Sequence, residues 1–196
     1  MKRIIFSCIA LAMTAVFAVA GQQLSLKDVV GGTFRSEALT GVTPLNGGET
    51  YARISDNGKQ IVAYSFRTGK QTAVLFDAET ARGPKLGRVE GYIMSPDGKR
   101  MLIQTQTKPI YRRSFTATYY IYTVRNNRLE PLSENGPQQS PLFSPDGLQI
   151  AFVRDNNIFI VKLLYDNAEV QITKDGKRNE VTSRSEERRV GKECRS

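Results

Sequence analysis

The chain has 196 residues, a formal net charge of +9 and no histidine. Without histidine, neither a Ser-His-Asp triad nor a Cys-His pair is complete within these residues, and histidine metal sites are excluded. The two cysteines, Cys8 and Cys194, lie in the terminal segments, outside the expected mature segment, so no disulfide and no thiolate chemistry are expected. No metal or other cofactor is expected. The positive charge is spread along the chain, whereas nucleic-acid binding requires a clustered basic face, so no nucleic-acid partner is expected.

The first twenty residues have the pattern of a secretory signal peptide. Lys2 and Arg3 precede an apolar stretch from Ile4 to Val16, and Ala18-Val19-Ala20 offers a small-residue cleavage site. The apolar stretch is short for the ~20 residues of a membrane-spanning helix. The sequence therefore predicts a signal peptide at residues 1–20, export to the periplasm or the medium, and no membrane span after cleavage.

The next segment mixes a short helical turn with turns and loops. Residues 25–30 are expected to form one helical turn, which Gly31-Gly32 ends. Asn46-Gly47-Gly48 is typical of a tight turn. Residues 64–77 predict two strands around Thr68-Gly69-Lys70, as in a hairpin. Residues 79–91 are expected to form a polar loop.

A strand–turn–strand unit recurs along the chain. MSPDGKRMLIQT (94–105) closely matches FSPDGLQIAFV (143–153), and ISDNGKQIVAYSF (54–66) is a weaker copy, so the turn glycines are 40 and 49 residues apart. Repeats of this length built from short strands are typical of β-propeller blades, although a β-sandwich with a recurring turn remains an alternative. The aspartates of these and neighbouring turns are interpreted as structural and not as catalytic carboxylates: Asp97, Asp146, Asp155 and Asp175.

The stretch from Lys108 to Val161 contains the strongest sheet pattern. Residues 114–124 and 149–153 predict strands, with the SPDG turn between them. A turn at residues 155–157 and a strand at residues 158–161 follow, and residues 169–173 predict one more strand. The predicted fold class is all-β, a partial β-propeller of about three to four blades within residues 21–181.

The last residues have a different character. RSEERRVGKEC (184–194) matches one reading frame of a sequencing adapter, so residues 182–196 are expected to be an assembly artefact. A basic disordered tail is the alternative.

YRRSFTATYYIY (111–122), followed by SPDG and VRDNNIFI, resembles the N-terminal propeller of dipeptidyl peptidase IV-like serine peptidases of the prolyl oligopeptidase family. In that family an eight-bladed propeller caps an α/β-hydrolase domain that carries Ser, Asp and His, and the enzyme releases dipeptides with proline or alanine second. The resemblance implies that Arg112 contacts a carbonyl of a peptide substrate near its N-terminus, and that the full-length protein forms a homodimer. By residue type alone, a solvated loop arginine or a rim salt bridge remains the alternative.

Two departures from the family pattern limit the resemblance. Arg113 stands where the family usually has histidine, and the family's glutamate motif does not follow Val181. Glu186-Glu187 is not accepted as the amine anchor, because it lies within the adapter-like string. The hydrolase domain is therefore expected to be absent from this chain, which should be inactive alone. The alternatives are a non-catalytic TolB-like binding propeller of the periplasm and a self-contained small β-domain with a genuine tail.

Overall fold

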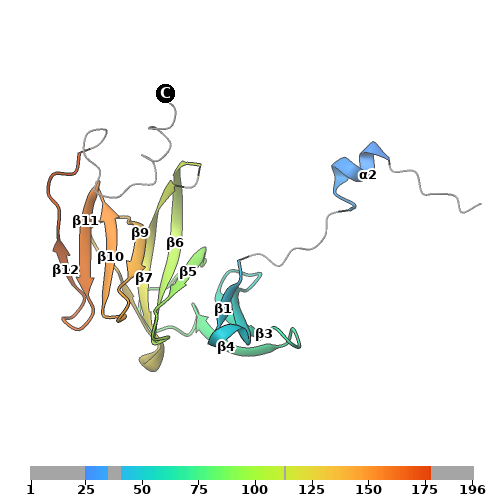
Figure 1. The fold of residues 1–196 in the computed structure, drawn as a ribbon, viewed down its shortest axis with the longest axis horizontal. Coiled ribbons are helices and arrows are strands. Elements are labelled where there is room, and N and C mark those ends of the chain that lie inside the picture. Colours follow the sequence, from blue (N-terminus) through green and yellow to red (C-terminus); the bar gives the residue numbers. More distant parts are fainter. Residues whose placement is uncertain (1–24, 35–40, 113, 178–196) are drawn as a thin grey trace, which may run out of the picture. The chain divides into compact units, whose positions relative to one another are not determined.

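A computed structural model describes residues 25–34, 41–112 and 114–177 (Figure 1). The chain divides into two units, residues 1–40 and 41–196, which are described separately. The predicted signal peptide and the predicted artefact tail lie outside the described residues. Across the described ranges, no helix is both long and apolar enough to cross a membrane.

The described residues of the first unit, 25–34, form one short helix, α2 (Leu26–Gly31). The side chain of Ser25 caps its start by accepting a hydrogen bond from the Asp28 amide at 3.1 Å. Gly32 ends the helix in the left-handed conformation, with φ of 77°. The predicted helical turn and its glycine stop are therefore confirmed.

The described part of the second unit forms three antiparallel sheets, each of four strands (Figure 1). The first blade contains β1 (Thr43–Leu45), β2 (Thr50–Ile54), β3 (Gln60–Ser65) and β4 (Gln71–Asp77). The second blade contains β5 (Gly91–Met94), β6 (Arg100–Tyr111), β7 (Ser114–Thr123) and β8 (Arg128–Pro131). The third blade contains β9 (Gln139–Phe143), β10 (Gln149–Arg154), β11 (Asn157–Lys162) and β12 (Ala168–Gln171). In each sheet the strands that follow one another in sequence are neighbours, which is the topology of propeller blades. The all-β partial propeller is confirmed, with three blades in the described residues.

The strand arrangement between Ser114 and Arg154 differs from the predicted one. The strands at residues 114–124 and 149–153 were expected to flank the SPDG turn, but they are β7 and β10 and belong to different blades. The unpredicted strands β8 and β9 lie between them, and the SPDG turn joins β9 to β10. The sequences RLEP and QSPLF are short and contain proline, so their strand pattern is weak, and pairing with β7 and β10 determines their conformation.

The recurring turn has the same hydrogen bonds in every blade. In the second blade the Ser95 hydroxyl donates to Asp97 Oδ1 at 2.6 Å and accepts from the Arg100 amide at 2.9 Å. Asp97 Oδ1 also accepts from the Lys99 amide at 3.0 Å. Equivalent contacts are made by Ser55 with Asn57 and by Ser144 with Asp146. The side-chain oxygens of Asp97 and Asp146 are thus used within their own turns, as expected for structural turn residues.

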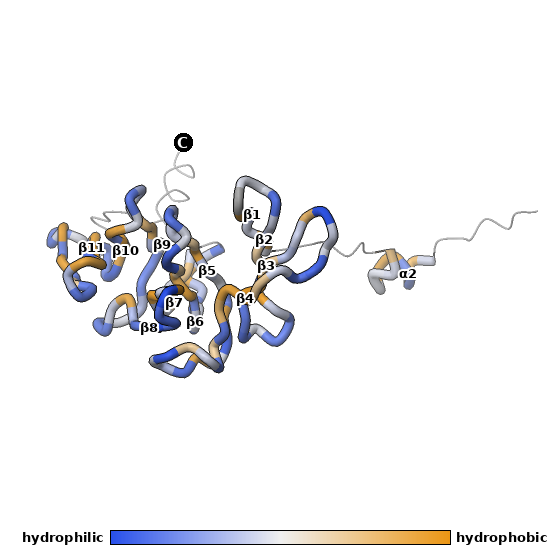
Figure 2. The backbone as a smooth tube through the Cα atoms, turned by 90° about the horizontal axis from the view of Figure 1, so that it is seen from below, coloured by the Kyte–Doolittle hydropathy of each residue, from blue (hydrophilic) through white to orange (hydrophobic). Residues whose placement is uncertain are grey.

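Apolar residues fill the two spaces between consecutive blades. The cluster between the first and second blades includes Ile61, Phe76, Met101, Ile103 and Tyr122. The cluster between the second and third blades includes Leu102, Tyr119, Ile121, Ile150 and Phe152. Adjacent residues of β6 face different blades because side chains alternate along a strand. Figure 2 shows hydrophobic segments within the sheets and hydrophilic residues at many of the connecting turns.

The first and third blades each have a face that no other described blade covers. On the first blade this face carries Phe66 and Val74, which are 49% and 47% exposed. On the third blade it carries Leu142 and Val170, which are 43% and 40% exposed. A propeller blade normally buries both faces between neighbours, so these apolar surfaces are typical of blades that lack one neighbour.

Candidate substrate-binding arginine at a hairpin tip

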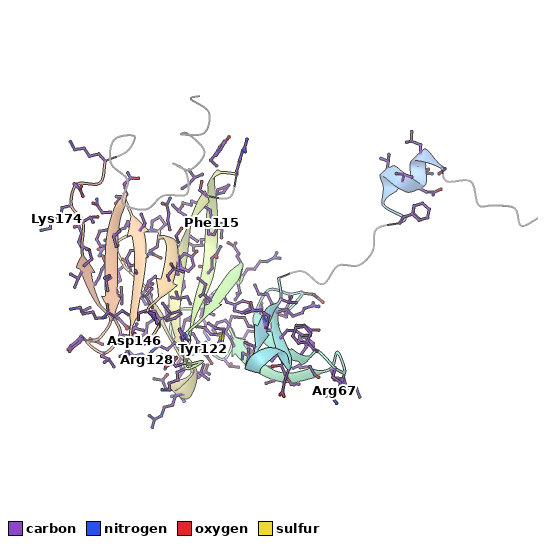
Figure 3. All side chains as sticks on the ribbon, viewed as in Figure 1. Arg67, Phe115, Tyr122, Arg128, Asp146 and Lys174 are labelled. Carbon is purple, nitrogen blue, oxygen red and sulfur yellow. The ribbon has the colours of Figure 1, made fainter. Side chains whose placement is uncertain are left out.

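The β6–β7 hairpin extends beyond the rest of the second blade. β5 pairs with β6 only as far as Gln104, and β8 pairs with β7 only from Tyr120 onward. Pairing between β6 and β7, by contrast, continues to Tyr111 and Ser114. We call residues 105–118 the arm. Figure 3 shows Phe115, the second residue of β7, near the tip of the arm and at the opposite end of the sheet from Tyr122.

Arg112 lies at the tip of the arm. Its side chain is exposed, and its guanidinium carbon lies 5.4 Å from the centroid of the Tyr111 ring, within the range of a cation–π contact. The Ser114 hydroxyl donates to the Tyr111 carbonyl at 2.8 Å across the turn. Arg112 itself has φ of 41°, which is uncommon for a residue with a side chain. The turn therefore presents the guanidinium outward beside an aromatic ring.

Within the described part of the chain, no ion pair involves Arg112. The rim salt bridge considered from the sequence is not formed there. A guanidinium carries a permanent charge and holds its N–H donors in one plane. Such a group is suited to bind a carbonyl or carboxylate oxygen of a ligand.

The base of the arm is anchored to the segment that precedes the third blade. The Gln138 and Ala117 backbones pair through two hydrogen bonds of 2.8 and 3.0 Å. The fully buried Gln138 side chain also accepts from the Tyr119 amide at 3.0 Å. These bonds satisfy the edge of β7 where β8 no longer pairs with it, and so they hold the lower part of the arm in place.

A polar network surrounds a bulge in β6. Thr107 donates its amide to Glu90 Oε2 at 2.7 Å, and its hydroxyl oxygen accepts from Gln104 Nε2 at 2.8 Å. The hydrogen bonds from Thr107 hold the pKa of the Glu90 carboxyl below its usual value, and the charge of Arg88 acts in the same direction. The Tyr119 hydroxyl donates to Gln104 Oε1 at 3.3 Å, and burial raises the pKa of Tyr119 to about 12, so this donor keeps its proton at neutral pH.

Arg112 is the residue that the sequence analysis predicts to contact the substrate, and it lies within the described residues. Arg113 and the rejected pair Glu186-Glu187 lie outside the described residues. Asp146, in the β9–β10 turn of the third blade, and Arg128 of the second blade both lie at the opposite end of the blades from the arm (Figure 3). Sequence reasoning missed Glu90 and Gln104. Glu90 is 17 residues before its partner Thr107, and no local motif connects them.

Blades stacked face to face and an outward arginine on an extended hairpin define part of a β-propeller with a candidate ligand-binding edge. Residues 95–185 match the family model for the dipeptidyl peptidase IV (DPP IV) N-terminal region. The crystal structure of Porphyromonas gingivalis dipeptidyl peptidase 4 is similar with a TM-score of 0.70 and 38% identity, over 80% of this chain and 22% of that chain.

Two curated proteins are also similar to this chain in sequence. Prolyl endopeptidase FAP of Homo sapiens is 31% identical over 159 residues, which are 81% of this chain and 20% of that protein. A probable dipeptidyl-aminopeptidase B of Emericella nidulans is 35% identical over 181 residues, covering 80% of this chain and 18% of the relative. The chain spans about a fifth of the length of these proteins. The chain is therefore a propeller fragment that is similar to the dipeptidyl peptidase IV N-terminal region.

Proposed function

We propose that this chain is the N-terminal propeller part of an exported dipeptidyl peptidase IV-like serine exopeptidase. The full protein would release dipeptides with proline or alanine second from peptide N-termini. The catalytic Ser, Asp and His would come from a hydrolase domain outside these 196 residues. The periplasmic or secreted location follows from the signal-peptide pattern at residues 1–20, and homodimer formation from the family resemblance.

The observation that carries this proposal is the exposed guanidinium of Arg112 at the tip of the arm. It lies inside the segment that matches the family model, in the motif that resembles the family's substrate-contacting arginine. A charge-assisted hydrogen bond from this group to a substrate carbonyl would stabilise the bound peptide by about 1.5–3 kcal/mol. In this role Arg112 orients the substrate, and the bond-breaking chemistry takes place elsewhere.

The first test is a long sequencing read of the source locus across Val181. A frame that continues into a glutamate motif and a G-x-S-x-G serine with Asp and His would support the proposal. A frame that reproduces RSEERRVGKECRS and then stops would refute it and favour a non-catalytic binding propeller. The purified 196-residue chain is expected not to cleave a Gly-Pro chromogenic substrate, and cleavage would contradict the assignment of catalysis to a separate domain.

A further inference from the structure

Glu90 holds the bulge from which the arm projects. It directly precedes β5, and its amide donates to the Gln104 carbonyl at 2.9 Å, so its backbone is fixed beside β6. The pairing of β6 with β7 passes from Thr105↔Thr118 to Lys108↔Thr116, which leaves one extra residue in β6. Such a bulge bends a strand and leaves a backbone amide outside the ladder.

The carboxylate of Glu90 accepts a hydrogen bond from a backbone amide of this bulge. Its Oε2 accepts from the Thr107 amide at 2.7 Å, next to Gln106, whose φ is 52°. A bulge that contains a residue with left-handed backbone conformation can join the two segments of its strand in more than one backbone conformation. A hydrogen bond that anchors one amide of the bulge favours one of these conformations. Gln104 binds the Thr107 hydroxyl from the same strand, so Thr107 is held from two sides.

The orientation of this bulge affects Arg112 strongly because the arm acts as a lever. Arg112 lies five residue steps along the chain from Thr107, a length of about 16 Å at ~3.3 Å per residue. A rotation of ten degrees at the base would move the tip by about 3 Å over that length. Misplacement of a substrate-positioning group by about 1 Å is enough to lower catalytic efficiency.

We propose that Glu90 is a positioning residue for Arg112, because its carboxylate locks the β6 bulge and thereby sets the direction in which the arm presents the guanidinium. The consequence for substrate binding rests on the proposed function. The lock itself does not, and it can be tested in the chain alone.

The test uses the full chain with a reporter at the tip of the arm. The chain contains no tryptophan, so Ile110→Trp introduces a single fluorophore at a site that is 40% exposed. In this background we would compare Glu90→Ala with Glu90→Gln, which keeps an acceptor oxygen. Glu79→Ala is the matched control, because it removes an exposed carboxylate that pairs with Lys59 away from the arm. The readouts are hydrogen exchange of the Thr107 amide by NMR and the anisotropy decay of the tryptophan.

Glu90→Ala is expected to accelerate exchange of the Thr107 amide about tenfold, and to increase the amplitude of fast motion at the reporter. Glu90→Gln is expected to stay close to the parent chain, and Glu79→Ala to match it. Equal behaviour of Glu90→Ala and Glu79→Ala in both readouts would overturn the proposal. If Glu90→Ala does not fold by circular dichroism, Glu90→Asp replaces it, because its shorter side chain withdraws the acceptor from the Thr107 amide. A Thr107 amide that stays as protected in that folded variant as in the parent chain would overturn the proposal.

In the protein encoded by the complete reading frame, Glu90→Ala is expected to raise KM for a Gly-Pro substrate about tenfold and to change kcat less than about twofold. Glu90→Gln is expected to restore KM. An unchanged KM in Glu90→Ala would overturn the positioning role while the proposed function stands. If the parent protein has no peptidase activity, the proposed function fails, and the exchange and anisotropy data still decide whether Glu90 locks the bulge.

Discussion

Arg154 and Glu169 form an ion pair on the face of the third blade that meets the second blade. The Arg154 guanidinium donates to Glu169 Oε1 at 2.5 Å and to the Ser133 hydroxyl at 2.6 Å. It also lies 4.0 Å from the centroid of the Phe159 ring. The two charged side chains are only 10% and 18% exposed, so replacing Arg154 by alanine leaves a largely buried carboxylate without its cation.

Arg154→Ala is expected to lower the free energy of unfolding by about 3 kcal/mol at pH 7. This is the lower end of the range for breaking a buried pair, because both side chains keep some exposure. The substitution also reverses the effect of Glu169 on the pH dependence. Burial raises the pKa of Glu169, but the hydrogen bonds from Arg154 and Ser133 outweigh it, so the pKa lies below its usual value.

In the parent chain Glu169 therefore stabilises the fold above the pKa of the unfolded state, and this contribution is lost as the pH falls through the lower, folded pKa. Without Arg154, burial is the largest remaining influence on the pKa of Glu169, opposed by the hydrogen bonds from Ser133 and Asn135. We expect burial to prevail, so that the charged carboxylate destabilises the fold at pH 7 and protonation relieves it. The stability gap between parent and Arg154→Ala should thus shrink between about pH 7 and pH 4.

The assay is urea unfolding followed by circular dichroism at pH 7 and pH 4. Glu169→Gln in the Arg154→Ala background is the companion variant, since it removes the unpaired charge and should recover part of the loss. A loss below about 1 kcal/mol at pH 7, which is the magnitude of an exposed pair, would refute the reasoning. A gap that does not change with pH would refute the assignment to the Glu169 carboxylate.

Three further predictions concern the arm and the open blade faces. In the complete peptidase, Arg112→Ala is expected to raise KM for a Gly-Pro substrate roughly ten- to hundredfold in steady-state kinetics. The control Arg125→Ala, beyond the other end of β7, is expected to leave KM unchanged. Because hydrogen bonds from Thr107 lower the pKa of Glu90, the carboxylate should stay charged from neutral pH down to the ordinary pKa of a glutamate, and protection of the Thr107 amide should stay constant over that range, as read by amide exchange. Loss of protection near neutral pH would contradict this. We expect the exposed apolar faces to make the chain self-associate, and Leu142→Glu on the open face of the third blade to reduce this association in sedimentation experiments. Unchanged association would show that this face does not mediate it.

The parts of the fold that could be predicted are those that neighbouring residues encode. The SPDG turns combine three local side-chain effects and lead into apolar runs, so the strand after each turn could be predicted, whereas β9 before the third-blade turn could not. β7 and β11 are rich in aromatic and β-branched residues, and both ends of each strand were predicted within one residue. β1, β8 and β9 are short and contain proline or lie next to it, so their pairing with neighbouring strands determines their structure.

The same distinction holds for the site. Arg112 could be proposed from its motif, and the structure adds its exposure, its ring contact and its left-handed backbone. Its role in substrate binding stays a prediction. Glu90 could not be found in the sequence, because its function depends on a bulge 17 residues later that only the paired strands create.

Residues 79–91 show how a segment without strand pattern connects two blades. The sequence predicted a polar loop, but Arg82 forms a parallel bridge with Arg128 of β8. The Arg82 amide donates to the Asn127 carbonyl and the Leu129 amide to the Arg82 carbonyl, both at 2.8 Å. This linker therefore satisfies the open edge of the second blade as it leaves the first, so that the connection and the edge stabilise one another.

Gly83 makes this bridge possible. A Cβ atom at Gly83 would lie 2.1 Å from the Leu129 carbonyl oxygen, and φ of 132° is a conformation that side chains rarely adopt. Gly83→Ala should therefore break the bridge and lower the free energy of unfolding by about 2–3 kcal/mol, measured by urea unfolding. Gly87→Ala is the control in the same linker, since a Cβ there meets nothing within 4 Å. Equal stability of the two variants would show that the linker contributes little to the blade edge. A selective loss in Gly83→Ala, with faster exchange of the Leu129 amide, would show that this backbone bridge helps to hold consecutive blades together.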